Sequence, residues 1–240
     1  MNFSIALAVY NGEKYISQQI ESILPQMGLN DELILSYDKS EDESLLIIEK
    51  FAKEDKRVKV IINHKPGLFN NFENAISHCN NEIVFISDQD DIWTKNKCEI
   101  MMNNFLNSEI DMVIHNGVHF NSATYEESKD FFSMYQIKNG IIRNLLKPRY
   151  SGCCMAFRRK LVSIMLPIPK TCGGYDHWIG MVGEYYGNVK FIDEILIYHR
   201  LHDSNFTPIS RRSLLTIIKA RSSILYNLFM RRYKAIETTN

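Results

Sequence analysis

The fold class is decided by one stretch near the N-terminus, FSIALAVYNG at residues 3–12. Its first seven residues form an apolar run interrupted only by Ser4, which is typical of a parallel strand buried on both faces. The next three residues break this pattern, and isoleucines then follow at helical spacing from Ile16 to Ile23. A buried strand, a polar turn and an amphipathic helix therefore open the chain.

Outward from this stretch the same alternation continues. Further strands are expected at 33–36, 58–62 and 82–87, and further helices at 40–52 and 70–78. A capping box of Ser40 and Glu43 would open the second helix. The order β-α-β-α-β-α-β, complete by Ser87, predicts an α/β fold with a Rossmann-like, doubly wound and mostly parallel sheet.

The second half of the chain is less regular. Helices are expected at 95–106, 158–166 and 176–186, and strands at 111–114, 189–193 and 195–199. Residues 116–150 are polar, rich in aromatic side chains and poorly periodic. The sequence therefore predicts the details of this half less closely than those of the first.

Composition narrows the classes of function. The 240 residues carry no formal net charge, so no overall field attracts the protein to nucleic acid. The five cysteines include no Cys-x-x-Cys pair, which favours reduced, partly buried thiols. No apolar run reaches the roughly 18 residues of a membrane span, and residues 3–9 lack the basic leader of a signal peptide. A cytoplasmic protein is expected.

The most informative segment is the acidic motif Asp88-Gln89-Asp90-Asp91, which directly follows an apolar strand. Three neighbouring carboxylates need a cation, a hydrogen-bond network or full solvation to offset their repulsion. Mg²⁺ and Mn²⁺ prefer carboxylate oxygens and share their coordination with phosphates. A metal site at the carboxyl edge of the sheet, where ligands of such sheets bind, is one interpretation. A solvated acidic turn is the other.

Two alternative sites are poorly supported. A calcium loop beginning at Asp88 would need glycine where Trp93 stands. A dinucleotide site would need several glycines after the first strand, and Gly12 stands alone there.

Seven segments in order resemble family 2 glycosyltransferases with the GT-A fold, over about residues 2–206. They are residues 8–12, residues 38–42, Gly67 with Asn71, residues 87–93, residues 151–157, residues 175–178 and residues 198–205. The resemblance is to the bacterial branch of rhamnosyl-, glucosyl- and galactosyltransferases that assemble surface polysaccharides. It implies a nucleotide-sugar-binding half at 1–110 and an acceptor-binding half of the same domain at 111–208, before a C-terminal basic amphipathic helix at 209–240.

The resemblance also assigns the nucleotide-binding residues. Ala8 and Tyr10 would line the base with Glu13 nearby, and Asp38 would touch the base or the ribose. The family usually has a second aspartate where this chain has Tyr37. This departure leaves the contact of Asp38 open, with stacking of Tyr37 on the base as the alternative.

The acidic motif would bind the metal and the donor. Asp88 and Asp90 would form the D-x-D pair, with Asp90 as the direct ligand of Mn²⁺ or Mg²⁺ and Asp88 also meeting the ribose. Asp91 would support the metal or the donor sugar. His202 would approach the metal or the diphosphate, although a structural histidine is an equal alternative.

Asp176 would be the general base on the acceptor hydroxyl, with capping of its own helix as the alternative. Tyr175 and Trp178 could offer aromatic faces to sugar rings, and Trp178 could equally lie in the core. His177 fits a hydrogen-bonding wall residue better than a ligand.

Two further features concern the acceptor. The loop with Gly152 and Cys153 is assigned to its binding side, because glycine permits close approach of the backbone. From Arg211 to Lys234 there are seven basic residues and no acidic one. Such a helix can lie on the inner face of the cytoplasmic membrane, or it can dock on its own domain or form a dimer contact.

The leading hypothesis is an inverting, metal-dependent enzyme that moves a hexose from UDP-glucose or UDP-galactose. Its acceptor would be a lipid-linked saccharide of the undecaprenyl-diphosphate-GlcNAc type, in O-antigen or capsule biosynthesis. A dTDP-rhamnose-dependent transferase and a non-catalytic nucleotide-sugar-binding module are the alternatives. A nucleotidyltransferase is disfavoured, because the loop at Tyr10-Asn11-Gly12-Glu13 is short and acidic instead of glycine-rich and basic.

Overall fold

The computed structural model of the chain describes residues 1–121, 124, 126–202 and 213–237, the last six without side chains. The strands are β1 (Phe3–Val9), β2 (Glu32–Tyr37), β3 (Val58–Ile62), β4 (Ile83–Ser87), β5 (Ile92–Trp93), β6 (Met112–Asn121), β7 (Glu127–Asp130), β8 (Met155–Arg158) and β9 (Val189–Leu201). The α-helices are α1 (Ile16–Ile23), α2 (Ser44–Glu54), α3 (Leu68–Ser77), α4 (Lys97–Asn104), α5 (Phe131–Tyr135), α6 (Ile141–Leu146), α7 (Val162–Met165), α8 (Tyr175–Tyr186) and α9 (Leu214–Glu237).

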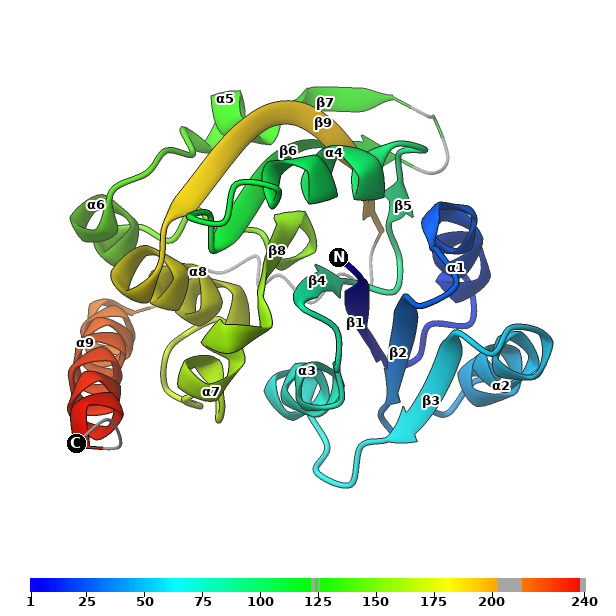
Figure 1. Cartoon of the computed structure of the whole chain (residues 1–240), viewed down its shortest axis with the longest axis horizontal. Helices are drawn as coiled ribbons and strands as arrows, with labels where there is room; N and C mark the ends of the chain where they lie inside the picture. The colour runs from blue at the N-terminus through cyan, green and yellow to red at the C-terminus, as the bar shows by residue number, and fades with distance from the viewer. Residues whose placement is uncertain (122–123, 125, 203–212, 238–240) are drawn as a thin grey trace.

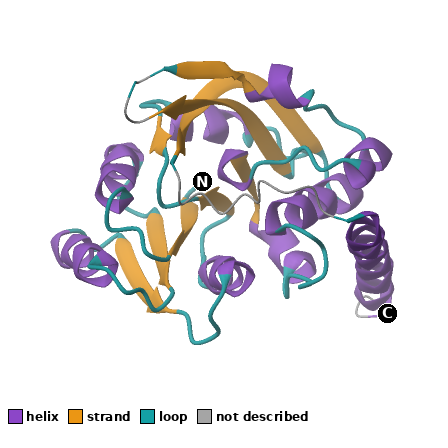
Figure 2. Cartoon of the chain, turned by 180° about the vertical axis from the view of Figure 1, so that it is seen from behind, coloured by secondary structure: helices purple, strands orange, loops and turns teal. Residues whose placement is uncertain are grey.

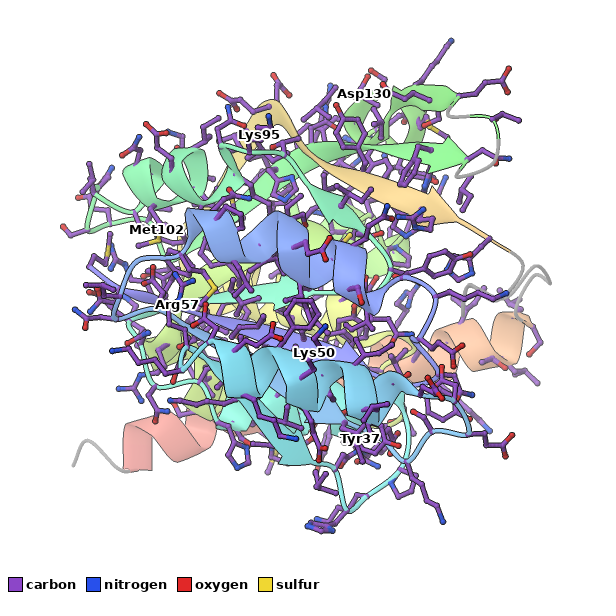
Figure 3. The ribbon with its side chains drawn as sticks, turned by 90° about the vertical axis from the view of Figure 1, so that its right-hand side faces the viewer. Tyr37, Lys50, Arg57, Lys95, Met102 and Asp130 are labelled. Carbon is purple, nitrogen blue, oxygen red and sulfur yellow. The ribbon has the colours of Figure 1, made fainter. Side chains whose placement is uncertain are left out.

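The first half forms the parallel, doubly wound sheet that the sequence predicts. β1 lies between β2 and β4 and is parallel to both, and β3 continues the sheet beyond β2. All seven residues of β1 are buried, which confirms a strand covered on both faces. α1 and α2 cover one face and α3 the other (Figure 1). Figure 3 faces α1 and α2, with Lys50 marking α2.

The same sheet continues into the second half with mixed direction. Its order is β3-β2-β1-β4-β8-β6-β9-β5, with β7 paired to β6. β8 is antiparallel to both β4 and β6, whereas β6 and β9 are parallel to each other. One continuous sheet therefore joins the two halves, and the acidic motif connects β4 to β5 at its edge.

Three expected elements differ in the structure. The helix expected at 158–166 is shorter, because residues 155–158 pair with β4 as strand β8 before a 3₁₀ turn and α7. The strands expected at 189–193 and 195–199 are one strand, β9. Its exposed residues Asp193 and Glu194 lie where the register between β9 and β6 shifts. In the sequence these two acidic residues look like the end of one strand, but in the structure the strand continues through them.

The predicted capping box is also wrong. α2 begins at Ser44, and its N-cap Glu43 makes no side-chain capping bond. Ser40 is engaged elsewhere, because its hydroxyl accepts the N–H of Asn11 and donates to the carbonyl of Asp38. The turn before α2 therefore holds the loop after β1 in place.

The C-terminal helix α9 packs on α8 at one side of the molecule, as Figure 2 shows from behind. Its buried residues Ala220, Ile224 and Leu228 follow one another at helical spacing. None of the helices in the described part of the chain has the length and hydropathy needed to cross a membrane. All five cysteines are buried, and none of them forms a disulfide, as expected.

Candidate active site at the carboxyl edge of the sheet

The acidic motif is connected to two segments that lie about a hundred residues further along the chain. The hydroxyl of Tyr175, the first residue of α8, donates to Asp88 Oδ1 at 3.2 Å. His202 Nε2 lies 2.8 Å from Asp90 Oδ2, directly after β9. The structure therefore brings the predicted metal residues together with the helix that carries the predicted base.

Asp91 has a different environment from its two neighbours. Its side chain is fully buried, and Oδ1 accepts the backbone N–H of Arg200 at 3.2 Å. Among the described residues, Oδ2 has no hydrogen-bond partner. Arg200 also donates from Nε to the carbonyl oxygen of Asp90 at 2.8 Å and from its guanidinium to Gln18. Arg200 therefore fixes the backbone of the acidic motif, a role that the sequence analysis did not assign.

The electrostatics of the cluster favour a cation. Burial, then the charges of Asp91 and Asp90, raise the pKa of Asp88 to about 8. Burial and Asp90 also raise the pKa of Asp91 well above its usual value. These shifts reflect the cost of holding ionised carboxylates close together inside the protein, and a divalent ion would offset that cost.

The donor atoms of the cluster suit such an ion. Side-chain atoms of Asp88, Asp91 and Cys153 all lie within 4.8 Å of one another. Carboxylate oxygens are the ligands that Mg²⁺ and Mn²⁺ prefer, and the buried, unpartnered Oδ2 of Asp91 lies in the same cluster. The two carboxylates of this cluster therefore fit the predicted metal, whereas the Cys153 thiol is not a ligand that these ions prefer.

The predicted nucleotide side is organised by Gln89, which the sequence analysis did not single out. Its amide accepts the backbone N–H of Tyr10 and donates to the carbonyl of Tyr10, both at 2.8 Å. A Cβ atom on Gly12 would lie 2.4 Å from Gln89 Oε1, so a larger residue here would displace the Gln89 amide. Ala8 is buried at the end of β1, whereas the side chain of Tyr10 is 55% exposed. Gln89 therefore joins the acidic motif to the loop after β1.

Asp38 lies buried at the end of β2. Its Oδ2 accepts the N–H of Gly67 at 2.7 Å, whereas Oδ1 has no partner within the described part of the chain. Tyr37 is also buried, and its hydroxyl accepts the N–H of Ser40, so its ring is not open for stacking on a base. Glu13 accepts the N–H of Glu43 at the start of α2. Of the two alternatives, the structure disfavours stacking of Tyr37, and the contact of Asp38 with the nucleotide stays a prediction.

Asp176 is the second residue of α8 and is partly exposed. The N-cap position of this helix is Gly174, but Asp176 Oδ1 accepts the N–H of His177 at 2.7 Å and so satisfies one donor of the first turn, as the capping alternative expects. Tyr175 stacks on Phe72 with ring centroids 4.0 Å apart. A Cβ on Gly152 would lie 2.4 Å from the Tyr175 hydroxyl, so the loop at 152–154 contacts α8 closely.

The other predicted acceptor residues lie inside the protein. Trp178 is fully buried with its ring N–H bonded to the carbonyl of Met165, so it belongs to the core and offers no face to a sugar. His177 is buried between the carbonyl of Asn144 and the guanidinium of Arg221, as a hydrogen-bonding wall residue would be. Cys153 is also fully buried. These three side chains support the site from behind.

Lys97 was not expected at the site. Its side chain is fully buried, its ammonium donates to the carbonyl oxygen of Cys153 at 2.8 Å, and it lies 4.0 Å from the centroid of the Trp93 ring. Burial lowers its pKa, whereas the neighbouring thiols and Asp91 act in the opposite direction. Lys97 falls four residues before the buried Met101 on α4, and this spacing is the signal that places it on the inner face.

A pair of histidines lies on the neighbouring strands β6 and β9. The Nδ1 atoms of His119 and His199 are 3.1 Å apart, and His119 Nε2 lies 2.7 Å from the hydroxyl of Tyr135. Burial, then the nearby His199, lower the pKa of His119 to about 4. This pair is therefore not doubly protonated at neutral pH. The last residues of the quoted C-terminal motif, 203–205, lie outside the described residues.

The chain is similar to glycosyltransferases over most of its length. The model of the family described as glycosyl transferase family 2 matches residues 4–164. EpsH of Bacillus subtilis (strain 168), named as a glycosyltransferase, is 34% identical over 222 residues, or 88% of this chain and 64% of EpsH. WfgD of Escherichia coli, named as a UDP-Glc:alpha-D-GlcNAc-diphosphoundecaprenol beta-1,3-glucosyltransferase, is 31% identical over 51% of this chain and 45% of WfgD.

A solved structure gives the same result for the fold. The structure of S. aureus TarS (1–349) with UDP-GlcNAc superposes with a TM-score of 0.73 at 18% sequence identity. The match covers 95% of this chain and 66% of the TarS chain. This likeness confirms the GT-A fold. The chain spans about two thirds of TarS and of EpsH, and less than half of WfgD.

Proposed function

This chain belongs to glycosyl transferase family 2, and from that premise we propose that it is an inverting, metal-dependent hexosyltransferase. The donor is UDP-glucose or UDP-galactose, and the acceptor is a hydroxyl of a lipid-linked saccharide of the undecaprenyl-diphosphate-GlcNAc type. The pathway is O-antigen or capsule biosynthesis at the inner face of the cytoplasmic membrane. A donor of dTDP-rhamnose is the second candidate.

One observation carries the proposal: the bond from the Tyr175 hydroxyl to Asp88. It connects the motif that would hold the diphosphate to the helix whose next residue is Asp176. A transferase needs its base and its leaving-group stabiliser on opposite sides of one reacting carbon. The bond between Tyr175 and Asp88 keeps the segments that carry these two groups next to each other. The nucleotide end is supported by the buried, unpartnered oxygen of Asp38 and by the loop that Gln89 holds.

Asp88, Asp90 and His202 would hold Mn²⁺ or Mg²⁺ together with the diphosphate, with Asp91 supporting them from its buried position. When bound, the ion supplies positive charge that stabilises the departing nucleoside diphosphate. His202 orients the side chain of Asp90, and Arg200 holds the backbone of Asp90 through its carbonyl oxygen.

Asp176 would remove the proton from the acceptor hydroxyl. The bond from this oxygen to the anomeric carbon forms on the face opposite the breaking bond to the diphosphate, so the configuration inverts. The N-terminal end of α8 favours the ionised carboxylate that this task requires. The N–H of His177 bonds to one of its oxygens and fixes the orientation of the carboxylate.

The relatives support the classes of substrate. The name of WfgD contains UDP-Glc as donor and a diphosphoundecaprenol-linked sugar as acceptor, and TarS was crystallised with UDP-GlcNAc. The alternative of a non-catalytic binding module would keep the nucleotide site but would not turn over a donor.

The decisive experiment measures release of nucleoside diphosphate from a panel of UDP- and dTDP-sugars, with and without Mn²⁺ and a lipid-linked acceptor. We expect one UDP-hexose to be consumed only with metal, and Asp90→Ala to abolish turnover. A protein that binds UDP but hydrolyses and transfers no donor would support the binding module. Full activity of Asp90→Ala in the presence of a chelator would refute the metal role.

A further inference from the structure

Helices α6, α8 and α9 lie on the same side of the molecule (Figure 1). Side chains from all three line one apolar groove. The groove has a volume of about 430 Å³, and every side chain that lines it is apolar or aromatic. Ile142 of α6, Tyr185 of α8, and Leu225 and Phe229 of α9 form its outer walls. It lies apart from the acidic motif and takes no part in the chemistry proposed above.

The outer walls of this groove remain open to solvent in the structure. Ile142 is 73% exposed, Phe229 65% and Leu225 52%. On α9, Leu214 and Ile218 continue the exposed row at helical spacing, whereas Ala220, Ile224 and Leu228 face the domain. α9 thus has two apolar faces, one docked and one unpartnered among the described residues. Large contiguous apolar patches of this kind mark surfaces that bind a protein or a membrane.

The exposed face of α9 is held in a fixed orientation. The hydroxyl of Tyr186 donates to the carbonyl of Leu228, and the guanidinium of Arg231 donates to the carbonyls of Ile164 and Pro167. Arg221 contacts His177 at 3.3 Å. The sequence left docking on the domain and binding to a membrane as alternatives, but docking through one face leaves the second face available.

The charge around the groove identifies its partner. Residues 141–147, which include α6, contain Arg143 and Lys147 and no acidic residue, and the described side chains of α9 include three basic ones and no acidic one. Arg143, Lys147 and Lys219 each directly follow an exposed apolar residue in the chain. The carboxylate of Glu184 on α8 is turned to Asn144. A second copy would present the same positive face and be repelled. A partner that offers both apolar groups and negative charge would therefore complement this face.

We propose that the face formed by α6, α8 and α9 docks on the surface of a bilayer containing anionic phospholipid, with acyl chains entering the groove. This inference rests on the proposed function, because docking would give the enzyme access to a lipid-linked acceptor held at that surface. Met181 and Tyr185 lie five and nine residues after Asp176 on α8, or about 7 and 13 Å along the helix. Docking therefore brings the base close to the level of the lipid headgroups.

The test is flotation of the full chain with vesicles of phosphatidylcholine alone or with 30% phosphatidylglycerol, where that fraction is a chosen, roughly physiological anionic content. We expect binding only to the anionic vesicles, weakened by high salt. The double variant Leu225→Ser/Phe229→Ser should bind them at least roughly tenfold more weakly. Leu29→Ser/Leu46→Ser, at exposed apolar positions away from this face, is the matched control and should bind normally.

Equal binding to both kinds of vesicle, or unchanged binding of the Leu225/Phe229 variant, would overturn the proposal. So would a parent chain that dimerises through this face and ignores vesicles. Release of UDP with a water-soluble acceptor separates this inference from the proposed function. The Leu225/Phe229 variant should retain that activity and lose turnover only on acceptor embedded in vesicles. If the chain floats with anionic vesicles but transfers no sugar, the docking proposal would stand and the proposed transferase activity would be refuted.

Discussion

The ammonium nitrogen of Lys97 lies 2.8 Å from the carbonyl oxygen of Cys153, at a position that solvent does not reach. This bond joins α4, which follows the acidic motif, to the turn at Gly152–Cys154, which contacts Tyr175. A buried lysine is costly unless its charge is used, and here it lies beside a cluster of carboxyls. Lys97 therefore positions the turn and offsets negative charge beneath the motif.

Replacing Lys97 with Met tests this relationship. The variant leaves the carbonyl of Cys153 without its donor, which costs about 1–3 kcal/mol of stability, and it releases the turn that contacts Tyr175 beside Asp88. We expect a lower melting temperature and weaker binding of Mn²⁺ with UDP, measured by calorimetry. Lys95→Met, at the exposed position labelled in Figure 3, is the control. Unchanged metal binding in Lys97→Met would leave Lys97 only a structural role.

Replacing Tyr175 with Phe removes one hydroxyl and keeps the ring that stacks on Phe72. Because only the bond to Asp88 is lost, we expect Mn²⁺–UDP affinity to change several-fold, or about 1 kcal/mol, with the melting temperature nearly unchanged. Titration of the metal into the UDP-bound protein measures this effect. A large fall in stability with normal metal affinity would mean that the hydroxyl serves the fold alone.

Replacing Asp176 with Asn separates chemistry from binding. An amide cannot accept the acceptor proton, so kcat should fall by about 10²–10⁴, while the Kd for the donor stays within about twofold. Single-turnover rates and donor titration give the two quantities. Asp193→Asn, an exposed carboxylate on β9, controls for the loss of charge. A parallel loss of rate and of donor affinity would contradict the role of base.

The histidine pair predicts how stability depends on pH. His119 has a pKa of about 4 in the folded protein, against 6.5 in its ordinary state. Between these values the unfolded chain binds a proton that the folded chain does not, so the free energy of unfolding falls as the pH falls. His119→Asn should make that fall smaller between pH 6.5 and 4, as measured by urea denaturation at several pH values.

The exposed His64 provides the matched control for this experiment, as His64→Asn. If the parent, the control and His119→Asn lose stability in parallel over this range, the His119–His199 contact does not govern it.

The sequence predicts the fold best where local pattern and burial agree. The strands β1 and β3 have the predicted bounds, because β1 is apolar and buried throughout and β3 is a short, mainly β-branched run between polar segments. β8 was not predicted, since four residues beside a glycine turn carry too little periodicity. Trp178 illustrates a second limit. The sequence places this aromatic residue two positions after Asp176 but does not distinguish a ring that faces a sugar from one that lies in the core.

The site follows the same division. Asp88 and Asp90 could be proposed as metal ligands because neighbouring carboxylates carry that chemistry, whereas Asp176 and His202 were proposed from the family resemblance. Gln89 and Lys97 could not, because their roles come from pairing with backbone atoms 79 and 56 positions away in the chain. Such pairings depend on how the sheet brings segments together. They become visible only in three dimensions.

The contact between Gly12 and Gln89 has a consequence for how this protein can vary. A side chain at position 12 would occupy the space of the Gln89 amide, so neither position can change freely while the other stays the same. In diverged copies of this chain, a larger residue at 12 should occur with a shorter one at 89, and the pair should be inherited as a unit.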